Sequence, residues 1–292
     1  MSSSLQARVI TALILMAVLV FISTQFSAFS FALFVAFVVL LAAWEWAAFL
    51  GLRSFVERLP YIFTIGSMLV MLALFLGVTP GADSIDSSRV AILCALGFLF
   101  WSFTFLVLRG YPENAEAVGN RSRIAFIGMC AFLPTWAGMV YLKYLMPEAY
   151  LVLALIIMVA AVDVGAFFVG SFFGHTKLSS KISPNKSWEG VWGGLATCLL
   201  LGLLFTWLYH RLIFQLEAWQ LLILSLLSIC VSFYGVVGDL VESMLKRNCD
   251  VKDSGAILPG HGGLLDRVDS LMAVTPIFVL TIMFTIAGFG QS

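Results

Sequence analysis

The stretch WQLLILSLLSICVSFYGVVGDL, residues 219–240, contains one charged residue, Asp239, in 22 positions. A helix needs about 20 mainly apolar residues to cross a bilayer core of about 30 Å. Runs of this kind recur along the chain and predict nine spans, at residues 9–26, 29–50, 61–79, 90–108, 124–145, 150–172, 191–209, 219–240 and 271–289. We therefore predict an all-α integral membrane protein with about nine transmembrane helices.

The composition supports the same fold class. Of the 292 residues, 61% are hydrophobic and 11% are charged, and the mean hydropathy is +1.04. A soluble all-α protein of this composition would leave most apolar faces unburied. The net charge is zero, so the total charge does not indicate an acidic or basic partner. We expect membrane lipids as partners and no nucleic acid. With no repeat or soluble insertion, 1–292 is predicted to be one membrane domain, made of N-terminal helices (1–149) and a C-terminal part (150–292) that holds both polar loops.

The distribution of basic residues predicts the orientation. If the N-terminus is cytoplasmic, all but three of the 16 Lys and Arg lie on the cytoplasmic side, as the positive-inside tendency requires. The three exceptions are Arg89, Lys143 and Arg211. The run 9–26 is long for a signal peptide and is interpreted as a retained helix. The polar loops 173–190 and 241–270 then share the cytoplasmic side.

Charged residues concentrate between Asp239 and Ser270. They could form a binding or catalytic site, or they could simply belong to a solvated loop. The charged residues there are Asp239, Glu242, Lys246, Arg247, Asp250, Lys252, Asp253, Asp266, Arg267 and Asp269. If the helix that contains Asp239 continues past the membrane surface, the residues at i+3, i+4 and i+7 share its face. These residues are Glu242, Ser243 and Lys246. This spacing favours a built site over a solvated loop.

A second acidic face is predicted where the last helix begins. Asp266, Asp269 and Ser270 follow the i, i+3, i+4 spacing in its first turn. The helix dipole alone would favour an acid there. Two aspartates opposite Asp239, which lies at the interface where an unpaired carboxylate is costly, are typical of oxygen ligands for Mg²⁺.

Glycines and bases between these helices favour phosphate binding. Glycine lets the backbone approach a phosphate closely and adopt positive φ, and Lys or Arg can hold phosphate oxygens. The glycines are Gly255, Gly260, Gly262 and Gly263, and the bases are Lys246, Arg247, Lys252 and Arg267. Together with the carboxylates they predict a triphosphate site.

The second polar region, residues 162–194, begins with an intramembrane acid, Asp163. It is either a ligand or a structural acid paired with a neighbouring helix. The loop that follows supplies Lys177, Lys181 and Lys186, which either follow the positive-inside tendency or bind an anionic lipid headgroup. Ser183-Pro184 predicts a rigid turn, and Ser187 predicts a helix N-cap.

The residues from Ser243 to Asp269 resemble the signature of the phosphatidate cytidylyltransferases, or CDP-diacylglycerol synthases. The signature reads S-x-hydrophobic-K-R, then K-D, then P-x-H-G-G, then D-R-hydrophobic-D, and every fixed position is met. The resemblance extends to G-D-L-x-E-S at 238–243 and to the family's D-x-G-A to G-G stretch at 163–194. Within that stretch Val164 and Ser171 depart from the family pattern.

The resemblance implies a reaction. In this family the phosphate of phosphatidic acid attacks the α-phosphorus of CTP with Mg²⁺ as cofactor, giving CDP-diacylglycerol and pyrophosphate. It thus implies CTP and phosphatidic acid as substrates, a multi-pass position in the bacterial inner (plasma) membrane, and a homodimer. A second cation, monovalent or divalent, stays open. A phosphomonoester is largely dianionic at neutral pH, so positioning and charge neutralisation suffice without a strong base.

Resemblance and placement together assign roles to the residues. The predicted catalytic residues are Lys246, Arg247, Asp266 and Asp269, and the predicted metal ligands are Asp239, Asp266 and Asp269. The predicted substrate-binding residues are Lys186, Ser187, Ser243, Lys252, Asp253, His261, Gly262, Gly263 and Arg267. For His261 a phosphate contact and a structural hydrogen bond in the tight turn are both open.

Two other functions fit parts of the pattern. A secondary transporter of an anionic solute also uses intramembrane acids, but predicts charges near the midplane of several helices and repeat symmetry. Another lipid phosphotransferase, such as a CDP-alcohol phosphotransferase, predicts a D-G-x-x-A-R motif that is absent from the sequence. The clustering of charge at one face favours the cytidylyltransferase.

Overall fold

The computed structural model describes residues 16–113, 119–249, 251, 254–255, 257 and 262–286. Within them, eight helices are long and apolar enough to cross a membrane. They are α2 (Ala28–Trp46), α3 (Phe55–Leu76), α4 (Ser87–Arg109), α6 (Arg121–Leu145), α7 (Tyr150–Phe173), α8 (Trp188–Leu212), α9 (Ala218–Asn248) and α10 (Leu265–Thr285). Each overlaps one predicted span, which confirms the all-α membrane fold. The span predicted at 9–26 lies partly outside the described residues, and its described part is the shorter apolar helix Met16–Gln25.

Local capping explains where two of the helices begin. The start of α3 lies ahead of the predicted span because Ser54 and Glu57 form a capping box in front of it. The start of α8 follows Ser187, whose Oγ accepts a hydrogen bond from the Gly190 amide at 3.2 Å. The predicted N-cap is therefore confirmed.

Helix α9 is longer than a membrane crossing. Its 31 residues correspond to about 46 Å at about 1.5 Å per residue, against a bilayer core of about 30 Å. The helix therefore continues past the apolar layer, as the spacing of its charged residues predicts. The polar end of α9 carries Asp239, Glu242, Ser243 and Lys246 on one face.

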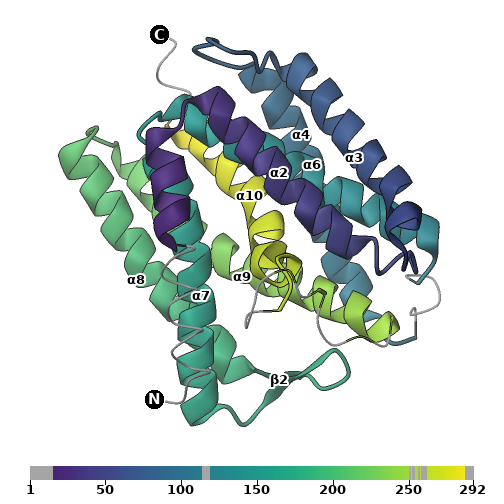
Figure 1. The fold of residues 1–292 in the computed structure, drawn as a ribbon. Coiled ribbons are helices and arrows are strands. Elements are labelled where there is room, and N and C mark those ends of the chain that lie inside the picture. Colours follow the sequence, from purple (N-terminus) through teal and green to yellow (C-terminus); the bar gives the residue numbers. More distant parts are fainter. Residues whose placement is uncertain are drawn as a thin grey trace.

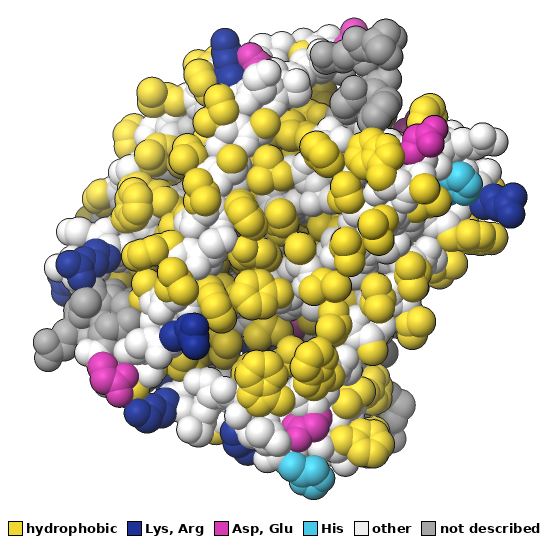
Figure 2. Space-filling model, turned by 180° about the vertical axis from the view of Figure 1, so that it is seen from behind, with side chains coloured by type: hydrophobic (Ala, Val, Ile, Leu, Met, Phe, Trp, Pro, Cys, Tyr) yellow, Lys and Arg dark blue, Asp and Glu magenta, His cyan; other side chains and the backbone are white. Residues whose placement is uncertain are grey.

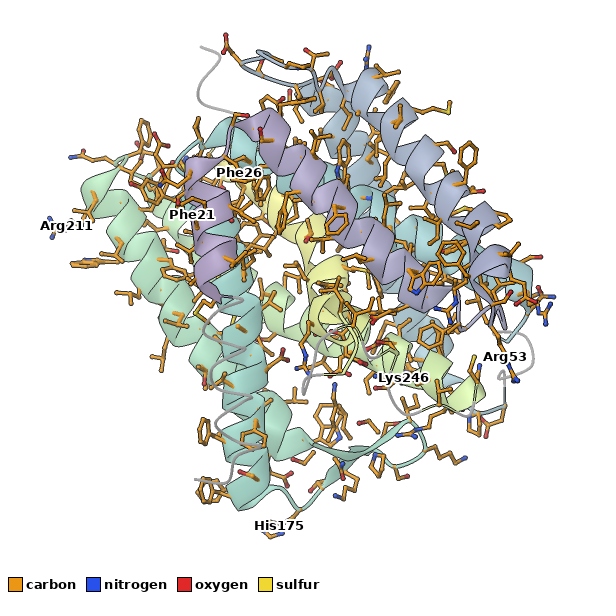
Figure 3. The ribbon with its side chains drawn as sticks, in the orientation of Figure 1. Phe21, Phe26, Arg53, His175, Arg211 and Lys246 are labelled. Atoms are coloured by element: carbon orange, nitrogen blue, oxygen red, sulfur yellow. The ribbon has the colours of Figure 1, made fainter. Side chains whose placement is uncertain are left out.

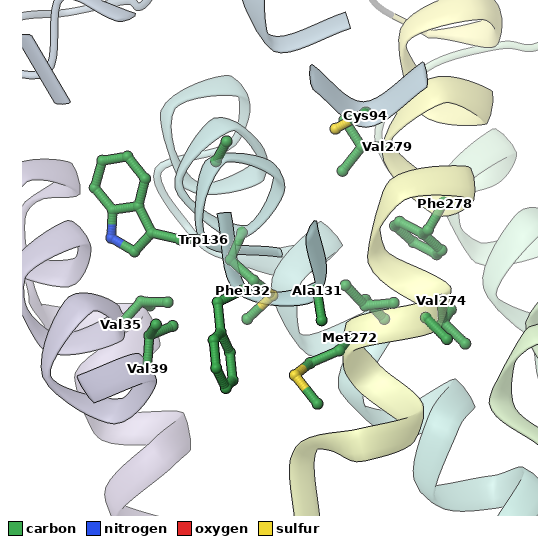
Figure 4. Packing of buried hydrophobic residues seen from close by; sticks show 14 of the residues in the cluster. Val35, Val39, Cys94, Ala131, Phe132, Trp136, Met272, Val274, Phe278 and Val279 are labelled. Carbon is green, nitrogen blue, oxygen red and sulfur yellow. The ribbon is translucent and has the colours of Figure 1, made fainter. Parts of the chain in front are cut away.

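The helices pack around α10. Figure 1 shows α10 in the middle of the bundle, with α7 and α8 to one side and α2 and α3 to the other. Helix α10 contacts α9, α4, α6, α7 and α2. In Figure 4, Phe132 of α6 lies between Val39 of α2 and Met272 of α10. This apolar packing fixes the position of α10, whose first turn carries two of the predicted site residues.

The outside of the bundle is apolar where a membrane would surround it. Figure 2 shows hydrophobic side chains across the middle of one face and charged side chains near its edges. Phe63 and Phe172 are 78% and 75% exposed. Soluble proteins rarely expose contiguous apolar patches of such extent, so lipid is the environment that this surface fits.

A small hairpin occupies the loop between α7 and α8. Strands β1 (Lys177–Ser179) and β2 (Ser183–Ser187) are antiparallel and pair Lys177 with Ser187 and Ser179 with Ser183. The predicted rigid turn at Ser183-Pro184 is instead the start of β2. Strand β2 contacts α9, and Figure 1 shows the hairpin at the same edge as the polar end of α9. The prediction that both polar loops share one side of the bundle is confirmed.

Candidate active site

Asp239 is the acid on α9 that lies closest to the apolar part of the helix. Its Oδ2 is paired with Nζ of Lys186 in β2, and its Oδ1 accepts a hydrogen bond from Ser243 Oγ at 3.2 Å. The side chains of Lys186 and Asp239 are 27% and 28% exposed. The hairpin therefore brings a partly exposed cation to an acid at the membrane face.

Two further acids belong to this group. Asp163 of α7 and Asp269 of α10 are each repelled by the charge of Asp239 and attracted by that of Lys186. Asp269 is 7% exposed, and its Oδ1 accepts a hydrogen bond from the Ser270 amide at 2.7 Å. We call Asp163, Lys186, Asp239 and Asp269 the Lys186 cluster. It joins three helices and a hairpin, and its acids outnumber its base.

A second cluster lies about one to two turns further along α9. Lys246 Nζ is 3.2 Å from Glu242 Oε2 and 2.7 Å from Asp266 Oδ1. We call these three residues the Lys246 cluster. Its side chains are 14%, 1% and 14% exposed for Lys246, Glu242 and Asp266. Figure 3 shows Lys246 near the start of α10, where it ties α9 to the first turn of that helix.

The other oxygen of Asp266 is held by backbone and hydroxyl donors. Asp266 Oδ2 accepts hydrogen bonds from Ser254 Oγ at 2.9 Å, from the Ser254 amide at 3.3 Å and from the Gly263 amide at 3.0 Å. Gly262 has φ +81°, and a Cβ there would lie 3.3 Å from Asp266 Oδ2. The glycines of the signature thus allow the chain to fold closely around an aspartate, where the sequence predicts a phosphate cradle.

Three other predicted residues have identified surroundings. Arg247 Nε donates a hydrogen bond to the Ile182 carbonyl at 3.2 Å, so this side chain reaches the hairpin. The positive charge of Arg267 acts on Asp163 of the Lys186 cluster. Ser187 caps α8 and lies beside Lys186. Their substrate contacts stay predictions.

Comparison with known proteins identifies the family. A family model described as "Cytidylyltransferase family" matches residues 6–285. The chain belongs to this cytidylyltransferase family. It is 38% identical over 287 residues to a phosphatidate cytidylyltransferase of Pseudomonas aeruginosa, covering 98% of this chain and 99% of the relative. Relatives of the same name in Haemophilus influenzae and Bacillus subtilis are 34% and 36% identical, over 94% and 70% of this chain and 97% and 71% of their own.

The three predicted metal ligands of this cytidylyltransferase separate between the clusters. Asp239 and Asp269 lie together in the Lys186 cluster, whereas Asp266 is in the Lys246 cluster. Among the described residues, no three His, Cys, Asp or Glu side chains are gathered closely enough to hold a metal ion. The donor chemistry of the Lys186 cluster fits Mg²⁺, because carboxylate oxygens are its preferred protein ligands. Its ligand set stays a prediction.

Several predicted site residues have no structural account. Lys252, Asp253 and His261 lie outside the described residues, as do Asp250 and Gly260. Their predicted contacts with CTP or lipid phosphate stay predictions. The two open roles of His261 are unchanged.

The structure brings into the site two acids to which the sequence assigned no catalytic, binding or metal role. Glu242 is 1% exposed, and its charge and that of Asp269 repel each other, so it connects the two clusters. Glu45 of α2 is 2% exposed and accepts a hydrogen bond from the Leu265 amide at 2.8 Å. The available signal for Glu45 was an acid within an apolar run, where an unpaired charge is costly.

Proposed function

We propose that this protein transfers the cytidylyl group of CTP to phosphatidic acid and releases CDP-diacylglycerol and pyrophosphate. The observation that carries the proposal is the match over nearly the whole chain to relatives named phosphatidate cytidylyltransferase. The two ion clusters at the polar end of the bundle agree with it, because they place bases and acids where a lipid phosphate would meet a nucleotide from water.

The reaction is an exchange at one phosphorus atom. A lipid phosphate oxygen attacks the α-phosphorus of CTP, the new P–O bond forms, and the bond to the β-phosphate oxygen breaks so that pyrophosphate leaves with its electron pair. The attacking phosphate is largely dianionic at neutral pH. No strong base is needed, and the protein must hold two anions in line and neutralise them.

The bases of the site supply the neutralising charge. Lys186 is partly exposed and can exchange its partner Asp239 for a phosphate oxygen. Lys246 is more deeply buried and keeps Asp266 oriented. Arg267, whose charge acts on Asp163, is the third candidate for a phosphate contact. Bases of this type hold phosphate oxygens by charge-assisted hydrogen bonds.

Mg²⁺ is proposed as the cofactor. Asp239 and Asp269 of the Lys186 cluster would hold it. Asp266, the third predicted ligand, lies in the Lys246 cluster. When bound, the ion neutralises phosphate charge and orients the triphosphate. The excess of acids over bases in the Lys186 cluster supports a cation there, and a second cation stays open.

The location is proposed to be the plasma (inner) membrane of a bacterium, with the polar end of the bundle in the cytoplasm. The apolar helices make it a multi-pass membrane protein, and its matched relatives are bacterial. The distribution of Lys and Arg supports the orientation. A homodimer stays a prediction.

The transporter and the other lipid phosphotransferase have no support among these observations. A transporter would place its acids near the midplane of several helices, but the clusters described above lie at one end of the bundle. The family that the chain belongs to is one of cytidylyltransferases.

The deciding experiment is a CTP-plus-lipid assay. Purified protein in mixed micelles with Mg²⁺, CTP and phosphatidic acid is expected to release pyrophosphate and to form CDP-diacylglycerol, detected by thin-layer chromatography of radiolabelled product. Diacylglycerol in place of phosphatidic acid lacks the attacking phosphate and is the matched control. Absence of a CTP-dependent product with any divalent metal contradicts the proposal.

A further inference from the structure

Glu45 connects the N-terminal helices to the site, although its own helix carries none of the predicted site residues. It lies one residue before the end of α2 and is 2% exposed. Its Oε2 accepts hydrogen bonds from the Leu265 amide at 2.8 Å and from Ser254 Oγ at 3.4 Å. Both donors flank the Gly-rich part of the signature, 209 and 220 residues further along the chain.

Helix α10 lacks a side-chain cap of its own. Its N-cap residue, Leu264, makes no side-chain capping hydrogen bond. The first N–H groups of a helix need a partner, and a negative charge is favoured at this end by the helix dipole. Leu265 is the first residue of α10. The carboxylate of Glu45 therefore caps α10 from another helix.

Two glycines, Gly255 and Gly263, pack tightly against this carboxylate. A Cβ on Gly255 would lie 2.2 Å from Glu45 Oε1. A Cβ on Gly263 would lie 2.7 Å from Glu45 Oε2 and 2.0 Å from Ser254 Oγ. Real Cβ atoms do not approach other atoms so closely, so Gly255 and Gly263 are required for the chain to pack against Glu45.

The same segments hold Asp266. Ser254 contributes its amide and hydroxyl to Asp266 Oδ2, and Gly263 contributes its amide. Ser254 Oγ is thus shared by two carboxylates, at 2.9 Å from Asp266 and 3.4 Å from Glu45. Glu45 contacts Ser254, Gly255 and Gly263 from the α2 side. Ser254 and Gly263 in turn hold Oδ2 of Asp266, while Lys246 contacts its Oδ1.

We propose that Glu45 is a positioning residue of the cytidylyltransferase reaction, which acts by fixing the loop and the first turn of α10 and thereby orienting Asp266. The expected effect on turnover rests on the proposed function. The contact that the inference invokes can be measured without turnover.

The chain provides a matched control in Glu57. Its Oε2 accepts hydrogen bonds from the amides of Arg53 at 2.8 Å and Ser54 at 3.0 Å. Glu57 therefore binds backbone N–H groups at a helix start, as Glu45 does, but it serves α3 and contacts neither cluster. Substitution of either glutamate removes a cap from a helix. Only substitution of Glu45 is expected to change the orientation of Asp266.

The experiment compares four variants of the full-length protein, Glu45→Ala, Glu45→Gln, Glu57→Ala and Glu57→Gln. We expect Glu45→Ala to lower kcat by on the order of 100-fold, because a small displacement of a reacting geometry has an effect of this size, with KM for CTP nearly unchanged. Glu45→Gln keeps an acceptor oxygen and is expected to lose on the order of 10-fold. The Glu57 variants are expected to keep the wild-type kcat.

Hydrogen–deuterium exchange supplies the second readout. Peptides that cover residues 262–268 are expected to exchange faster in both Glu45 variants and at the wild-type rate in the Glu57 variants. Wild-type kcat or wild-type exchange in the Glu45 variants overturns the proposal, as does an equal loss of kcat in the Glu57 variants. If Glu45→Ala does not fold, Glu45→Gln decides by the same two measurements. If the wild-type protein does not use CTP, the proposed function is wrong. Hydrogen–deuterium exchange of residues 262–268 then still decides whether Glu45 holds the start of α10.

Discussion

The two ion clusters at the polar end of the bundle share an architecture and differ in access to water. In each, a lysine joins acids from α9 and α10. Lys186 comes from a hairpin and is 27% exposed, and its partner Asp239 is 28% exposed. Lys246 comes from α9 itself and is 14% exposed, next to Glu242 at 1%. An exposed pair can separate to admit a substrate at small cost, whereas a buried pair cannot. We therefore expect the Lys186 cluster to release its ion pair when a substrate phosphate binds, and the Lys246 cluster to stay closed and hold α9 against α10.

The largest effect is expected from Asp266→Asn, which removes the charge that orients Lys246 at 2.7 Å. Turnover with CTP and phosphatidic acid should fall by on the order of 1000-fold, the upper range for loss of one preorganised electrostatic contact. Membrane insertion and folding should persist, because the amide retains one acceptor oxygen. Wild-type turnover in a folded variant would show that Asp266 is neither a ligand nor an orienting group.

The second largest effect is expected on the free energy of unfolding, and it tests whether the Lys246 cluster is the more rigid of the two. Lys246→Met leaves Glu242 and Asp266 without their shared cation, and breaking a buried pair costs about 3 kcal/mol or more. The unfolding midpoint in detergent should fall clearly below that of the wild-type protein. Lys181→Met is the matched control, because its pair with Glu113 spans 3.8 Å and both side chains are well exposed. That control should change stability by less than about 0.5 kcal/mol.

The smallest effect is expected from Lys186→Met. Its pair with Asp239 is partly exposed, so we expect a stability change of less than about 1 kcal/mol together with a KM for CTP or for phosphatidic acid raised by about tenfold, the value of one 1.4 kcal/mol contact. Initial rates over a range of each substrate make this measurement. A loss of stability as large as that of Lys246→Met would abolish the distinction between the clusters.

The elements that the sequence predicts well depend on near neighbours in the chain. Ser187 caps α8 because its donor, the Gly190 amide, is three residues away. Asp239 and Ser243 meet because a helix brings residue i and residue i+4 together. Eight spans are found because an apolar run of about 20 residues crosses a bilayer wherever the neighbouring helices lie. These are local or solvent-driven properties.

The pairings across helices could not be predicted in the same way. The sequence places both polar loops on one side of the membrane, which leaves several acids as possible partners for Lys186. In the structure β2 packs against α9, and Lys186 pairs with Asp239. The predicted turn at Ser183-Pro184 is wrong because strand pairing with β1 incorporates it. The assignment of Asp239 and Asp266 to one metal site did not foresee that each is paired with a different lysine.

By itself the sequence determined the membrane fold, the polar side of the bundle and the acidic and basic residues from which the site is built, because these depend on hydropathy and on helical spacing. The tertiary structure alone decided which acid pairs with which lysine, and that Glu45 caps α10 across 220 residues. The reason is that such pairs depend on the crossing positions of packed helices. Those positions follow from the shapes of buried side chains such as Phe132 and Met272, which no local pattern reports.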